Sequence, residues 1–172
     1  SGKPATYFFY PGVYTFTPVA PSEYVDVNTK TVAVLDGVHG GTAYSADAAD
    51  VSLEATYSDK LKEAALDSAK EYLNSCASIP GNQNPDCPSA LNSDAVSAIS
   101  VKTMPTTLEP MDVDPGVFQG QVTFAVTYSD KSDMPGTRDV DAAVVVNVQF
   151  AKDGTLKLTP EGTPDFWVGT SR

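Results

Sequence analysis

The single histidine of the chain, His39, is the first residue to consider as a catalytic base. A base next to a serine, cysteine or threonine can activate it as a nucleophile, and Asp36 and Tyr44 are close to His39 in the sequence. The Gly-x-Ser-x-Gly turn that presents the serine of many hydrolases does not occur in the sequence, however. Because His39 lies among glycines, we expect it to occupy a loop and to have no catalytic role.

Closely spaced aspartates are the other candidates for chemistry, and they form three pairs: Asp112 and Asp114, Asp139 and Asp141, and Asp47 and Asp50. The first pair precedes a Pro-Gly turn and could offer oxygen ligands to calcium, but calcium requires six or more of them. The second pair falls on one face of an expected strand, where paired carboxylates can do acid–base work. We expect all three pairs to be solvated, with no metal and no cofactor.

Two aromatic clusters could bind a ligand. Phe166 and Trp167 lie near glycine and threonine, a setting in which aromatic rings sometimes stack on sugars. We expect this pair instead to pack into the core and to pin the terminal segment. The cluster Tyr7-Phe8-Phe9-Tyr10 is expected to form a strand or a junction with a membrane-proximal segment, rather than a ligand platform.

The charge of the chain excludes some classes of partner. Asp and Glu number 22 against 11 Lys and Arg, which gives a formal net charge of −11. A nucleic-acid-binding protein needs a basic surface that displaces counterions from phosphates, and no run of basic residues is present. The sequence therefore predicts no nucleic-acid partner and no direct contact with an anionic membrane surface.

The two cysteines, Cys76 and Cys87, indicate the compartment. The residues between them include proline, glycine and asparagine, so the segment is expected to fold back and bring its ends together. We predict a structural disulfide, which is typical of an oxidising compartment. Two alternatives stay open at this point, namely a pair of free thiols buried in the core and a metal-binding or redox-active pair.

The spacing of apolar residues predicts one long helix over residues 58–76. Ser58 or Thr56 can cap its start, and Asp59 suits the first turn because of the helix dipole. One stripe of the helix carries residues that recur at helical spacing and are expected to be buried: Leu61, Ala65, Ala69, Tyr72, Leu73 and Cys76.

After residue 95 the pattern alternates with a period of two, which predicts antiparallel strands. The expected strands cover residues 99–102, 121–128 and 139–150, followed by a hairpin at Asp153-Gly154 and a buried face that continues at Leu156 and Leu158. We therefore predict an α+β fold in which the long helix packs on an antiparallel meander sheet, a layer of the cystatin or NTF2-like type.

The first 57 residues are rich in aromatic residues and turn formers. Strands are expected over residues 13–17 and 31–35. We predict two parts, a β-rich segment or small module at 1–57 and a helix-plus-sheet domain at 58–172. Ser1-Gly2 has the character of a processing remnant, so an upstream transmembrane anchor is expected.

Two regions carry a resemblance to a known group of proteins. The first is the strand Phe9-Tyr10-Pro11-Gly12-Val13-Tyr14-Thr15-Phe16-Thr17, and the second is the helix over 58–76 with the loop that ends in Asp86-Cys87-Pro88. The chain resembles the extracytoplasmic domains of actinobacterial membrane-anchored proteins of unknown function. Their usual Gly-Cys-Pro-Phe is altered here, because Asp86 replaces the glycine and Ser89 the phenylalanine. The resemblance implies a location at the cell surface and brings no catalytic residues.

These features predict a non-enzymatic, acidic domain of the cell envelope that binds a protein, a peptide or a wall polymer outside the cytoplasmic membrane. Two alternatives remain at the level of sequence. One is an NTF2-like enzyme with a small-molecule cavity between helix and sheet. The other is a structural or sensor domain of a membrane-anchored protein.

Overall fold

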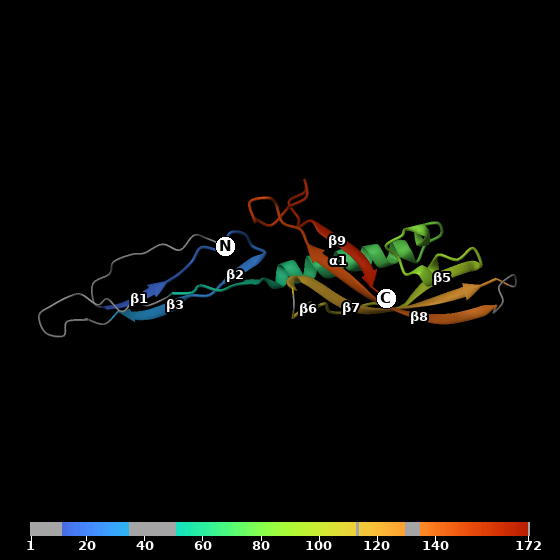
Figure 1. Ribbon diagram of the computed structural model, residues 1–172, viewed down its shortest axis with the longest axis horizontal. Coiled ribbons are helices and arrows are strands. Elements are labelled where there is room, and N and C mark those ends of the chain that lie inside the picture. The colour runs from blue at the N-terminus through green and yellow to red at the C-terminus, as the bar shows by residue number, and fades with distance from the viewer. Residues whose placement is uncertain (1–11, 35–50, 113, 130–134, 172) are drawn as a thin grey trace, which may run out of the picture. The chain divides into compact units, whose positions relative to one another are not determined.

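The computed structural model describes residues 12–34, 51–112, 114–129 and 135–171 (Figure 1). The chain divides into two compact units, Ser1–Lys60 and Leu61–Arg172. Several residues that the sequence singles out lie outside the described residues: His39, Asp36, Tyr44, Asp47, Asp50 and the cluster Tyr7 to Tyr10.

The described residues of the first unit, 12–34 and 51–60, form two small antiparallel sheets of two strands each. Strand β1 (Gly12–Phe16) pairs with β3 (Lys30–Val34), and β2 (Val25–Val27) pairs with β4 (Ala55–Tyr57). The predicted strands at 13–17 and 31–35 correspond to β1 and β3, each displaced by one residue. Strands β2 and β4 have three residues each and are too short for an alternating pattern to reveal.

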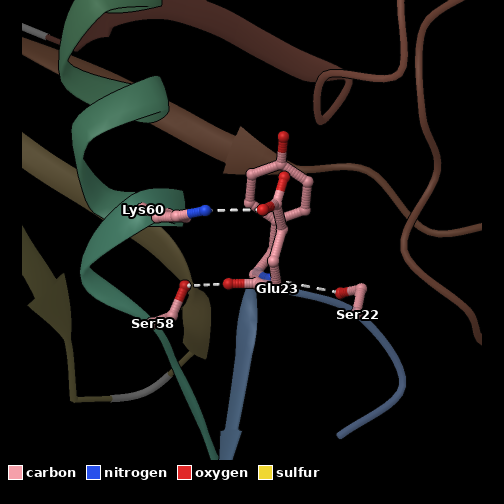
Figure 2. A network of polar contacts seen from close by, with 5 residues as sticks. Ser22, Glu23, Ser58 and Lys60 are labelled. Atoms are coloured by element: carbon pink, nitrogen blue, oxygen red, sulfur yellow. Dashed lines mark hydrogen bonds and ion pairs between the residues drawn. The ribbon is translucent and has the colours of Figure 1, made fainter.

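A small polar network holds the turn before β2 to the residues that begin the helix (Figure 2). Ser58 is buried, its backbone N–H donates to the carbonyl of Tyr24 at 3.1 Å, and its hydroxyl donates to the carbonyl of Glu23 at 2.9 Å. Lys60 forms an ion pair of 2.6 Å with the Glu23 carboxylate. The hydrogen bond from Lys60 and its positive charge lower the pKa of Glu23 below its usual range.

Helix α1 spans Asp59–Cys76, as the sequence predicts. Asp59 lies in the first turn, where a carboxylate interacts favourably with the helix dipole. Five of the six predicted stripe residues are fully buried, and Tyr72 is half-buried. The apolar stripe therefore forms one side of a core.

The second unit adds a curled antiparallel sheet of five strands, which makes the fold α+β. The strand order is β5-β7-β8-β9, and β6 also pairs with β7. The strands are β5 (Val96–Thr103), β6 (Glu109–Met111), β7 (Asp114–Tyr128), β8 (Gly136–Val148) and β9 (Phe166–Ser171). Figure 1 shows α1 lying along this sheet.

The two faces of the sheet differ in burial. On β7 and β8 the even-numbered side chains from 116 to 126 and from 144 to 148 are buried, because alternate residues of a strand point to opposite faces. We call this the covered face, and its buried apolar residues are Phe118, Val122, Phe124, Val126, Val144, Val146 and Val148. The odd-numbered residues form the opposite face, which we call the open face.

The predicted buried face extends too far at its C-terminal end. Phe150 and Leu158 were expected in the core, but their side chains are 50% and 46% exposed. Strand β8 ends at Val148, and the chain then forms only isolated bridges, Phe150 with Leu156 and Leu158 with Pro164. The alternation of the sequence continues past the point where the strand leaves the core, so the prediction was wrong for these two residues.

Candidate functional site

A recess in the second unit lies where one edge of the sheet is interrupted. Strand β5 pairs with β7 as far as Thr123, and β6 pairs with it again from Gln119, so residues 104–108 leave the sheet between them. Gly120 lies on β7 beside this gap. A Cβ atom on it would approach Leu108 Cδ2 to 2.7 Å and Pro105 Cβ to 3.0 Å, so the loop packs closely because this residue is glycine.

The gap opens into a groove of about 800 Å³, which we call the edge groove. Its walls combine apolar, amide and acidic side chains, including Met104, Met111, Gln119, Gln121, Glu109 and Asp112. Both carboxylates belong to exposed residues. The lining contains no lysine, arginine or histidine. The groove therefore offers flexible thioethers, hydrogen-bonding amides and uncompensated negative charge.

Two residues of the groove wall, Gln119 and Gln121, are odd-numbered residues of β7 and belong to the open face. The register places Gln119 beside Val145, and Val145 beside Gly169 on β9. Trp167 lies one pair further along, opposite Asn147. Three strand spacings of about 4.8 Å separate β6 from β9, so groove and tryptophan lie roughly 14 Å apart on the same face.

Trp167 is 47% exposed, which contradicts the prediction that Phe166 and Trp167 both pack into the core. Neighbouring residues of a strand point to opposite faces, so β9 cannot bury both. Phe166 is half-buried and pairs with Val148 of the covered face, whereas Trp167 is on the open face. A Cβ on Gly169 would lie 2.6 Å from the indole ring, so the far end of the ring lies close to this glycine.

The paired aspartates within the described residues are exposed, as predicted. Asp139 forms an ion pair with Lys102, and Asp141 accepts a hydrogen bond of 2.7 Å from the Thr123 hydroxyl. Asp114 accepts a hydrogen bond of 3.0 Å from the backbone N–H of Gly116, two residues on. Among the residues that the structure describes, no group of three or more His, Cys, Asp or Glu could hold a metal ion.

Cys76 and Cys87 form a disulfide with a Cα–Cα distance of 5.7 Å, and both are buried. The loop that the bond closes is held at its end by β9, because the carbonyl of Asp86 accepts hydrogen bonds from the Thr170 N–H at 3.1 Å and hydroxyl at 2.8 Å. The disulfide therefore connects the end of α1 to a loop that packs against the C-terminal strand. The sequence predicts the link between the helix and the loop, but not the packing of the loop against β9.

Tyr72 of α1 lies near this loop, and its hydroxyl is buried with no hydrogen-bond partner in the described part of the chain. Burial, and secondly the negative charge of Asp86, raise the pKa of Tyr72 to about 12. Because the folded-state pKa is raised, Tyr72 contributes stability below pH 10, and this contribution is lost as the pH rises through about 12.

We expect a titration of phenolate absorbance to include a late-ionising component from Tyr72. Asp86→Asn should lower the pKa of Tyr72, because it removes the nearby negative charge. The control Asp94→Asn removes an exposed carboxylate that does not perturb Tyr72. An unchanged titration curve for Asp86→Asn would contradict the assignment.

Comparison of the chain with protein-family models, with characterised proteins and with solved structures finds no match. In the described residues, no helix has the length and apolar character that a membrane span requires. The site is therefore interpreted from its own geometry and chemistry.

Proposed function

We propose that this chain is a non-enzymatic binding domain of the cell envelope, located outside the cytoplasmic membrane as part of a membrane-anchored protein. The Cys76–Cys87 disulfide supports an oxidising location, because such bonds persist mainly outside the cytosol. The α1 layer on the curled sheet supports a fold of the cystatin or NTF2-like type. The observation that carries the proposal is the edge groove.

The position of the groove favours binding over catalysis. An NTF2-like enzyme needs a cavity between helix and sheet, but Phe118, Phe124 and Leu73 are fully buried in that layer. The edge groove lies outside the helix–sheet layer, at the interrupted edge of the sheet. Its amides and thioethers can bind a ligand, and its two carboxylates, Glu109 and Asp112, belong to exposed residues rather than to an enclosed cavity.

The chemistry of the groove favours an extended, basic peptide segment of a partner protein. Glu109 and Asp112 offer negative charge that no basic lining residue neutralises. The methionines adapt to varied apolar side chains, and the amides of Gln119 and Gln121 can pair with a peptide backbone. A neutral wall polymer would make no use of the two carboxylates.

Glu109→Gln/Asp112→Asn is expected to weaken binding of a fluorescein-labelled octapeptide of alternating lysine and valine by roughly fivefold, because two partly exposed ion pairs are lost. Fluorescence polarisation at several salt concentrations measures the effect, and amide chemical shifts locate the peptide.

The matched control is Glu63→Gln/Glu161→Gln, which removes the same charge from two exposed positions outside the groove. Equal weakening in both variants would mean attraction by net charge alone and would overturn the groove as the site. Binding of purified peptidoglycan fragments that is insensitive to both variants would assign the domain to a wall polymer instead.

A further inference from the structure

The outer edge of β9 shows a regular pattern of backbone orientation. The N–H of Thr170 donates to the carbonyl of Asp86, which lies outside the sheet, so the backbone of Thr170 points away from β8. Asp165, five residues earlier, accepts a hydrogen bond of 3.1 Å from the N–H of Gln149, next to the end of β8. Backbone groups alternate in direction along a strand, so Phe166 and Val168 point outward with Thr170.

These outward groups lack a strand partner among the described residues. In the part of the chain that the structure describes, β8 is the sole neighbour of β9 in the sheet. Within the described ranges, no backbone hydrogen bond joins Phe166 or Val168 to a group beyond the sheet. The edge therefore presents the N–H and C=O of two residues at strand spacing, over roughly 10 Å.

The free stretch has defined ends. At its C-terminal end, the N–H and hydroxyl of Thr170 donate to the carbonyl of Asp86, which lies in the loop that the disulfide closes. At its N-terminal end the stretch begins at Phe166, because the N–H of Asp165 points to the β8 side, where it donates to the carbonyl of Lys157 at 2.9 Å. The outer edge is thus closed at Thr170 by the loop and open over Phe166 and Val168.

The sequence of β9 does not protect this edge. Natural sheets usually block a free edge with a charged side chain or a proline, but β9 reads Phe-Trp-Val-Gly-Thr-Ser. The opposite edge strand, β5, carries Lys102. The exposed indole of Trp167 lies close to Gly169 on the open face of β9, within reach of a side chain on a strand added to this edge.

We propose that the outer edge of β9 binds an extended segment of a partner polypeptide as an added strand, with Trp167 packing against one of its side chains. The alternating donors and acceptors identify the ligand as a peptide backbone, because this spacing matches that of another strand. The proposal does not depend on the edge groove, which lies at the other edge of the sheet.

Amide hydrogen exchange of the free protein tests the orientation. The amides of Phe166 and Val168 are expected to exchange rapidly, whereas those of Trp167 and Gly169, which point towards β8, exchange slowly. Slow exchange of Phe166 and Val168 in the monomer would show that the edge is already covered and would overturn the proposal.

A neutral octapeptide that alternates threonine and valine tests binding, with the fluorescence of Trp167, the single tryptophan, as readout. Its twin with N-methylated alternate amides keeps the side chains and loses the backbone donors, so it is expected to bind roughly tenfold more weakly. Equal affinity of the two peptides, or no binding of either, would overturn the proposal.

Val168→Pro removes one outward N–H and leaves the hydrogen bonds to β8, so it should weaken binding of the unmodified peptide, whereas Val168→Thr should not. If Val168→Pro fails to fold, the methylated peptide still decides. Glu109→Gln/Asp112→Asn should leave this binding unchanged, which separates it from the groove. Protection of Val168 that appears only with rising protein concentration would make the added strand a second copy and would contradict a partner peptide.

Discussion

Replacing Cys76 and Cys87 with alanine is expected to lower the free energy of unfolding by about 3 kcal/mol, because the disulfide closes a short loop in the unfolded chain. The cysteines are separated by 11 residues in the sequence. Urea denaturation of the variant and of the reduced wild-type protein should give the same loss, since both remove the same covalent link. Thiol titration of the unfolded, unreduced protein should find no free thiol.

The effect of this substitution should extend beyond stability. The disulfide holds the loop whose Asp86 carbonyl accepts two hydrogen bonds from Thr170, so the Thr170 amide should exchange faster in the variant. Exposed residues distant from the loop, such as Lys152, serve as the internal control for exchange. Two free thiols in the unreduced protein would contradict both the bond and the oxidising compartment that we propose from it.

The elements that the sequence predicts are those whose local pattern and tertiary environment agree. Helix α1 has a continuous stripe of buried residues, and its predicted bounds differ from the observed ones by one residue. Strands β7 and β8 alternate regularly because one face is covered and the other is open. The fold class follows from these three elements.

The missed elements have weak or misleading local signals. Strand β6 has three residues and contains Pro110, which is tolerated because β6 is at an edge. The sequence predicts that Phe166 and Trp167 of β9 both pack into the core, because both are large and apolar. Their opposite orientation becomes evident only from the pairing with β8.

The edge groove could not be predicted from the sequence, since it depends on where β5 and β6 each pair with β7. One signal was present, namely Gly120 within an alternating strand, because a strand-interior glycine often marks a close approach of another segment. From the sequence, Asp112 is only a candidate calcium ligand that we expect to be solvated instead. Its place in the groove wall gives it another role, as a source of negative charge.

Phe124→Ala is expected to have the largest effect on stability of any single truncation, about 3–5 kcal/mol in the free energy of unfolding. Phe124 is 0% exposed and lies on β7, between β5 and β8, in the layer beneath α1. Removing its ring loses apolar burial and leaves a cavity that the surrounding strands and helix cannot fill without moving.

Phe150→Ala is the matched control, since it removes the same ring from a side chain that is 50% exposed, beyond the end of β8. It should cost much less, and the difference between the two variants measures the core itself. A similar loss for both would mean that the 149–165 segment packs as tightly as the sheet and that the buried layer does not end at Val148. A small loss for Phe124→Ala would contradict a filled core between helix and sheet. It would instead favour the open cavity that an NTF2-like enzyme requires.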